Sequence, residues 1–208
     1  MKRLVLIVTL ILVSAVMTAG APNFGTDGLR GLTVKQKATL AKGGIIFYTT
    51  DVKGKNKSAL IQAILVFDKT PDQVWNLLFK TQDQIKYLKE IEKINIINKG
   101  TAKDKLEFHL SVAWLDYVYR VIHRFDFANK YFYWGLDPSF KNDLKDLRGY
   151  WKFYSYGEGK TLARYGSNVS IKNVPSFIEN MFKKNGVKKS LKAVRNYINS
   201  NGAWRVKR

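Results

Sequence analysis

The stretch LEFHLSVAW at residues 106–114, followed by YVYRVIHRFDF at residues 117–127, decides the fold of this chain. In the first segment every second residue is apolar, which places on one face Leu106, Phe108, Leu110, Val112 and Trp114. The second segment repeats the pattern with Tyr117, Tyr119, Val121, His123, Phe125 and Phe127, opposite Arg120, Arg124 and Asp126. Alternation between an apolar face and a wet face predicts neighbouring antiparallel strands.

Similar segments on either side extend this sheet. Its other strands are predicted at 58–67, 93–99 and 131–136, around Trp151 and Phe153, and at 163–172, and a separate strand at 45–52 is predicted in the N-terminal extension. Short helices are predicted at 33–42, from Pro71, and from Thr81 through Ile91. A long final helix begins at Ser176, which forms a capping box with Glu179, and it stops at Asn201-Gly202.

This order of elements predicts an α+β fold. A curved antiparallel sheet of about seven strands must bury its apolar face, and the C-terminal helix is the element long enough to be wrapped by it. The two short helices after the first core strand then close one end. A cavity is expected between the sheet and the helix.

Three stretches carry a family resemblance: FDKTPDQVW at 67–75, GYWKF at 149–153, and NVPSFIEN at 173–180 with LKAVR at 191–195. They look like the entry into the first helix, the glycine-led central strand and the final helix of the START-like, helix-grip or SRPBCC superfamily. This superfamily includes START lipid-transfer domains, polyketide cyclase/dehydrase proteins and coenzyme Q-binding proteins. The resemblance implies a helix-grip fold with a pocket for an apolar ligand, and it fixes neither ligand nor reaction.

The N-terminus predicts export. Lys2 and Arg3 precede an apolar run from Leu4 to Val16 and small residues at 18–21, the layout of a secretory signal peptide. The run is short for a membrane span, and an uncleaved signal anchor is the alternative. Either one places the body in the periplasm or cell envelope. The predicted units are a signal peptide at 1–20, an N-terminal extension at 21–57, a START-like domain at 58–200 and a basic tail at 201–208.

Composition narrows the class of partner. The 208 residues include 36 Lys and Arg against 16 Asp and Glu, and the net charge of +20 attracts anionic partners. Because the protein is expected to be exported, a membrane surface is the expected anionic partner and nucleic acid is not. The chain has no cysteine and two histidines, which argues against disulfides, thiolate sites and a His-rich metal centre. No motif for a nucleotide cofactor, a zinc protease or a serine hydrolase occurs, so we expect no cofactor, no metal and no conventional catalytic centre.

The candidate ligand-binding residues are mostly aromatic side chains on the apolar faces. They are Trp114, Tyr117, Tyr119, His123, Phe125, Trp151, Phe153 and Tyr165 from the strands, and Phe177 and Met181 from the final helix. Plain core packing is the alternative for all of them. His123 has two interpretations, an anchor or acid–base group for a ligand, or a core histidine satisfied by a neighbour.

Basic residues are concentrated near the C-terminus. Between 183 and 208 there are nine basic residues and no acidic one, and apolar residues are interleaved among them. This pattern predicts docking on an anionic membrane through Lys183, Lys184, Lys188, Lys189 and Lys192. A solvated helix face is the alternative.

The sequence therefore favours an exported protein that binds or carries a lipid or quinone-like molecule in an internal cavity. The second hypothesis is an aromatase/cyclase-like enzyme that uses His123, Arg124 or a pocket tyrosine. The third is a cationic surface or adhesion protein with a packed core.

Overall fold

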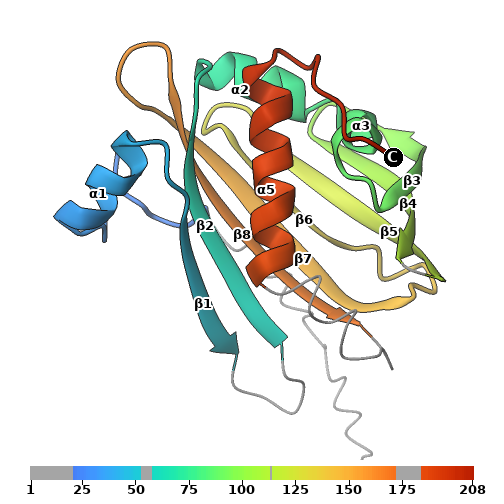
Figure 1. Ribbon diagram of the computed structural model, residues 1–208. Helices are drawn as coiled ribbons and strands as arrows, with labels where there is room; N and C mark the ends of the chain where they lie inside the picture. The colour runs from blue at the N-terminus through green and yellow to red at the C-terminus, as the bar shows by residue number, and fades with distance from the viewer. Residues whose placement is uncertain (1–20, 53–57, 113, 172–183) are drawn as a thin grey trace, which may run out of the picture.

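One curved antiparallel sheet dominates the computed structural model, which describes residues 21–52, 58–112, 114–171 and 184–208 (Figure 1). Its strand order is β1-β2-β8-β7-β6-β5-β4-β3. The strands are β1 (Ile46–Val52), β2 (Ser58–Phe67), β3 (Ile91–Lys99), β4 (Lys103–Val112), β5 (Leu115–Asp126), β6 (Tyr131–Leu136), β7 (Leu144–Ser155) and β8 (Thr161–Ile171). The described helices are α1 (Val34–Ala41), α2 (Pro71–Leu78), the 3-10 turn η1 (Thr81–Asp83), α3 (Gln84–Tyr87) and α5 (Lys184–Asn199).

The predicted α+β arrangement is confirmed, with a small difference in strand number. The sheet has eight strands in the described residues, where the sequence predicted about seven. The additional strand is β1, which pairs along its whole length with β2 at the edge of the same sheet. β2 also pairs with β8, so the second strand of the chain lies beside its last strand within the sheet.

Local sequence signals set the starts of the short helices. Thr33 caps α1 and Thr70 caps α2, each in a capping box with a glutamine three residues later. The predicted second short helix is too long, because α3 ends at Tyr87 and Ile91 already opens β3. A register shift between Ile91 and Lys93 places Ile91 and Ile94 on the same buried face. This β-bulge gives the strand a three-residue apolar spacing, which is typical of a helix.

α5 covers the concave face of the sheet (Figure 1). It buries Leu191, Val194, Tyr197 and Ile198. The helix ends where it was predicted to, since Asn201 and Gly202 have φ of 55° and 80°. The predicted start at Ser176 lies outside the described residues.

The N-terminal segment packs on the convex face. Arg164 of β8 donates hydrogen bonds to the carbonyl oxygens of Gly28 at 2.8 Å and Arg30 at 2.9 Å. Its guanidinium also lies under the ring of Phe24, 4.5 Å from the centroid. Residues 24–40 thus close the outer side of β2, β7 and β8, and Leu40 is buried there.

Candidate ligand-binding cavity

A cavity of about 690 Å³ lies between the concave face and α5. Its lining is largely apolar. The apolar lining side chains are Leu78, Tyr87, Leu88, Ile91, Phe108, Leu110, Tyr119, Val121, Phe132, Trp134, Leu147, Trp151, Tyr165, Val169, Val187, Leu191, Val194, Trp204 and Val206. Some of these belong to the core cluster under α2 and α5, and others to the separate cluster on β3, β4 and β5. The cavity therefore separates two halves of the interior.

Four of the predicted ligand-binding residues line this cavity: Tyr119, His123, Trp151 and Tyr165. Tyr117, Phe125 and Phe153 are buried on the same face of the sheet, but they pack into the core clusters outside the lining. Phe177 and Met181 lie outside the described residues. That any of these residues contacts a ligand remains a prediction.

Trp114 was expected on the apolar face, and that placement is wrong. β4 ends at Val112 and β5 begins at Leu115, so Trp114 falls in the hairpin connection with 76% of its surface exposed. Side chains alternate between the two faces only within a strand, so the pattern does not extend to a residue in the turn. Arg124, offered for a cyclase reaction, lies on the opposite face of β5, where its guanidinium is 5.7 Å from the ring centroid of Tyr133.

The lining also contains aromatic residues that the sequence did not single out. Phe132 and Trp134 of β6 face the cavity because β6 pairs in register with β5, which sets Trp134 opposite His123. The segment 131–136 is apolar on both faces, so its inner face could not be chosen without that register. Tyr87 ends the short helix α3 and Trp204 follows α5, and neither residue was part of a predicted apolar face.

His123 and Asp104 form a buried polar pair at the cavity wall. They are direct cross-strand partners on β5 and β4, and each is only 5% exposed. Nδ1 of His123 lies 3.4 Å from Oδ1 of Asp104, and neither atom has a hydrogen bond within normal geometry. Phe125, Phe132 and Trp134 surround the imidazole with ring centroids 6.0–6.1 Å away. Asp104 was not predicted as a site residue, although it is in phase with Leu106 on the apolar face of β4.

Burial shifts the two groups of this pair in opposite directions. Loss of hydration raises the pKa of Asp104 to about 6, against a smaller opposing effect of the Lys99 charge. Loss of hydration lowers the pKa of His123 to about 4. At neutral pH the imidazole is therefore uncharged and faces an ionised Asp104 through Nδ1. A proton on Nδ1 leaves Nε2 as a hydrogen-bond acceptor for a molecule in the cavity.

Two tyrosines add polar atoms to the apolar wall. Burial raises the pKa of the Tyr119 and Tyr165 hydroxyls, so both stay protonated at neutral pH. The Tyr119 ring stacks on Phe108 with centroids 5.3 Å apart. Tyr165 lies against Trp151 at 4.7 Å, and its hydroxyl interacts with Ser167 in the lining. A few fixed polar groups in a mostly apolar pocket can orient a ligand.

Exposed lysines mark the mouth of the cavity. Lys89, Lys189 and Lys192 are exposed and also belong to the lining. Of the other predicted docking residues, Lys188 is exposed on α5, Lys184 begins α5, and Lys183 lies outside the described residues.

The described residues contain no group of three or more histidine, aspartate or glutamate side chains that could hold a metal ion. In the same part of the chain, no helix has the length and apolar character needed to cross a bilayer.

Comparisons with known proteins identify the fold. No protein-family model and no curated protein sequence matches the chain. Solved structures do match, among them a STAR-related lipid transfer protein from Xanthomonas axonopodis with a TM-score of 0.62 and 14% identity, over 74% of this chain and 93% of that one. The Zhui aromatase/cyclase from a Streptomyces species has a TM-score of 0.57 and 14% identity, over 68% and 93%. A START superfamily protein from Mycobacterium smegmatis has a TM-score of 0.57 and 12% identity, over 68% and 97%. The chain therefore has the START-like, helix-grip fold of SRPBCC proteins.

Proposed function

We propose that this protein binds a lipid or quinone-like molecule in the cavity under α5. The observation that carries the proposal is the cavity of about 690 Å³ with an apolar lining. A volume of this size and a mostly apolar wall with a few polar groups are typical of small-molecule sites. Burying a ligand's apolar surface against such a wall contributes about 25 cal/mol per Å².

The His123–Asp104 pair favours a ligand with a polar group. Nε2 of His123 would accept a hydrogen bond from that group, and the Asp104 carboxylate would hold the imidazole in the required tautomer. The apolar body of the ligand would fill the aromatic part of the cavity. Solved structures with this fold include one described as a lipid transfer protein, which is consistent with such cargo.

We further propose that the protein acts outside the cytoplasm at an anionic membrane. The signal-like segment at 1–20 supports export. The exposed lysines Lys188, Lys189 and Lys192 on α5 support membrane docking, since two of them also line the cavity mouth.

The test of cargo binding is native mass spectrometry of the mature protein purified from its own envelope, followed by organic extraction. A stoichiometric lipid or quinone supports the proposal and names the cargo. A ligand-free mass together with no uptake from a lipid mixture overturns it.

A pair of matched variants locates the binding site. Val121→Phe adds a ring inside the cavity and should weaken binding of the extracted cargo at least tenfold. Val118→Phe makes the same substitution on the other face of β5, where Val118 is partly exposed, and should leave binding unchanged. Equal effects of the two variants would place the ligand elsewhere.

An enzyme of the aromatase/cyclase kind is the second candidate. The observation that favours it is the Asp104 carboxylate 3.4 Å from Nδ1 of His123, since a carboxylate beside a histidine can support a general base. His123→Ala would then abolish conversion of the extracted compound while binding persists. If the wild type converts nothing and His123→Ala loses binding, only the carrier function is supported.

A further inference from the structure

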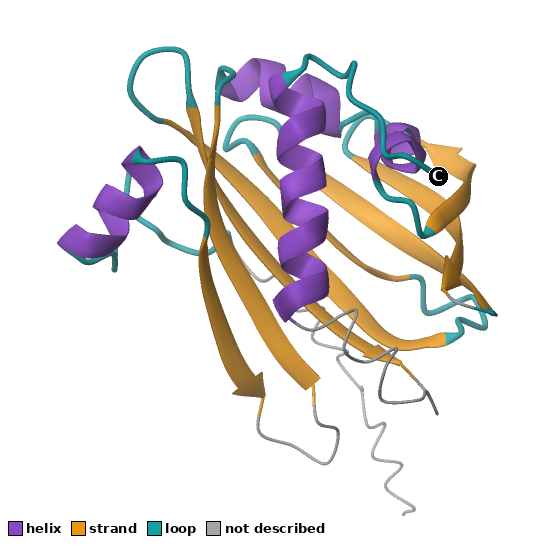
Figure 2. Ribbon diagram, viewed as in Figure 1, coloured by secondary structure: helices purple, strands orange, loops and turns teal. Residues whose placement is uncertain are grey.

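The C-terminal segment forms part of the cavity wall. After α5 the chain reverses at Asn201 and Gly202 and passes α3 as an extended strap, defined here as residues 203–208 (Figure 2). Trp204 and Val206 of the strap line the cavity beside Tyr87 of α3. The segment predicted as a basic tail is therefore docked on the domain.

Three hydrogen bonds hold the strap to α3 and β3. The Val206 amide donates to the Lys86 carbonyl at 2.9 Å. Nη2 of Arg208 donates to the carbonyl oxygens of Ile85 at 2.7 Å and Ile91 at 2.8 Å. Both acceptors of the guanidinium are neutral. A phosphate is a stronger acceptor, because charge-assisted hydrogen bonds are about twice as strong and a guanidinium can form two of them at once.

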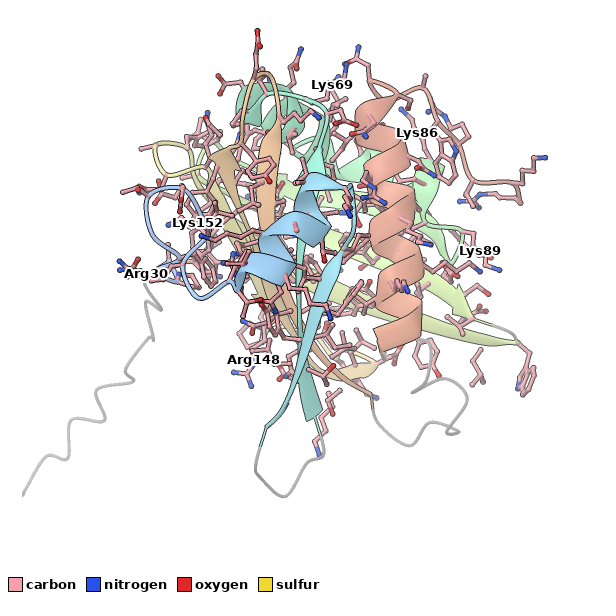
Figure 3. The ribbon with its side chains drawn as sticks, turned by 60° about the vertical axis from the view of Figure 1, so that its left-hand side comes forward. Arg30, Lys69, Lys86, Lys89, Arg148 and Lys152 are labelled. Carbon is pink, nitrogen blue, oxygen red and sulfur yellow. The ribbon has the colours of Figure 1, made fainter. Side chains whose placement is uncertain are left out.

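Positive charge surrounds the same opening. Arg205, Lys207 and Arg208 are exposed on the strap, and the exposed Lys89 and Lys189 belong to the same cavity lining as Trp204 and Val206 of the strap. Figure 3 shows Lys86 and Lys89 on the side of α5 along which the strap runs. Each basic residue near an anionic bilayer adds roughly fivefold to the affinity. The charge of this surface is therefore complementary to a bilayer that contains acidic phospholipid.

We propose that the strap is a latch on the cavity mouth and that a bilayer surface rich in anionic phospholipid opens it. The phosphates take Arg208 from the carbonyls of Ile85 and Ile91, which leaves the Val206 amide as the remaining hydrogen bond to α3. The strap then moves away from the cavity and takes Trp204 out of the wall. Cargo passes between the cavity and the bilayer without crossing water. This mechanism rests on the proposed function, because a latch needs a cargo.

Neighbouring residues of the strap provide matched variants. Arg208→Gln and Lys207→Gln remove the same charge, but only the first removes the hydrogen bonds to Ile85 and Ile91. Val206→Pro removes the remaining amide donor without any change of charge. The assay is the rate at which delipidated full-length protein takes up a dansyl-labelled fatty acid, with vesicles of phosphatidylcholine alone or with phosphatidylglycerol added.

The latch predicts a distinct pattern of rates. Wild-type uptake should be about tenfold faster with phosphatidylglycerol, and Arg208→Gln and Val206→Pro should be about tenfold faster than wild type without it. Lys207→Gln should keep the wild-type rate on phosphatidylcholine. Equal rates for Arg208→Gln and Lys207→Gln on phosphatidylcholine would overturn the latch.

Hydrogen exchange of the Val206 amide separates failure of the latch from failure of the proposed function. Its exchange should accelerate about tenfold on vesicles with phosphatidylglycerol, and not on phosphatidylcholine, whether or not cargo binds. An amide that stays protected on the anionic vesicles overturns the latch. Accelerated exchange in a protein that takes up no fatty acid supports strap release and counts against the cargo.

Discussion

Removing one member of the His123–Asp104 pair should make stability depend on pH, with opposite sign for the two members. Burial raises the pKa of Asp104 from 3.8 to about 6 and lowers that of His123 from 6.5 to about 4. Between these pH limits the folded pair holds one proton, on Asp104, and the unfolded pair also holds one, on His123. Equal numbers of bound protons mean that the free energy of unfolding has no pH slope from this pair.

Each single variant removes that compensation. In His123→Phe, Asp104 is left with a folded pKa above its unfolded value, so its contribution is fully present below pH 3.8 and is lost as the pH rises through about 6. In Asp104→Asn, His123 is left with a folded pKa below its unfolded value, so stability is lost as the pH falls from 6.5 through about 4. At about 1.4 kcal/mol per pH unit, each change amounts to about 3 kcal/mol.

The assay is urea unfolding of the wild type, both single variants and the double variant at constant ionic strength, from about pH 4 to about pH 7.5. Differences from the wild type cancel the titration of all other groups. Relative to the wild type, the free energy of unfolding of His123→Phe should fall as the pH rises, and that of Asp104→Asn should increase. The free energy of unfolding of the double variant should follow the pH dependence of the wild type. If both single variants also run parallel to the wild type, burial does not shift these groups and the inferred charge state of the cavity wall is wrong.

Three further substitutions test the packing around the sheet. Gly166→Ala should destabilise by about 1–3 kcal/mol in urea, because the added Cβ collides with the Tyr150 ring that crosses β8. Arg164→Gln should cost about 2 kcal/mol and speed proteolysis near Gly28, since it removes the bonds that hold the N-terminal segment. Unchanged proteolysis would contradict that role. Trp114→Ser should leave cargo affinity in a binding titration unchanged, because Trp114 lies outside the lining.

Local chemistry made much of the fold predictable from the sequence. The helix starts predicted at Thr33 and Pro71 are both present in the structure, where Thr33 and Thr70 each form a capping box with a residue only three positions later. The inward face of β5 follows from its own alternation, which is why Tyr119 and His123 were placed toward the interior correctly. Such features need no knowledge of which strand lies beside which.

Features that depend on strand register or on the main chain were not predictable in this way. Asp104 acts on His123 only because the β4–β5 hairpin sets these two residues opposite each other. An aspartate at the edge of an apolar run is ordinarily a surface residue. The strap is held by hydrogen bonds to main-chain carbonyls, and one of the donors is itself a main-chain amide. Main-chain groups are the same in almost every residue, so the sequence of the strap shows its charge but does not predict that it docks.

The division of the interior links cargo binding to stability. β2, β7 and β8 are packed on both faces, by the N-terminal segment outside and by α2 and α5 inside. The cluster on β3, β4 and β5 contains Phe108, Leu110 and Tyr119, which face the cavity, and Ile85 of α3 and Leu88 pack against this cluster. A molecule in the cavity would therefore touch both clusters at once. Binding at a free ligand concentration about 100 times the dissociation constant adds about 2.7 kcal/mol of stability.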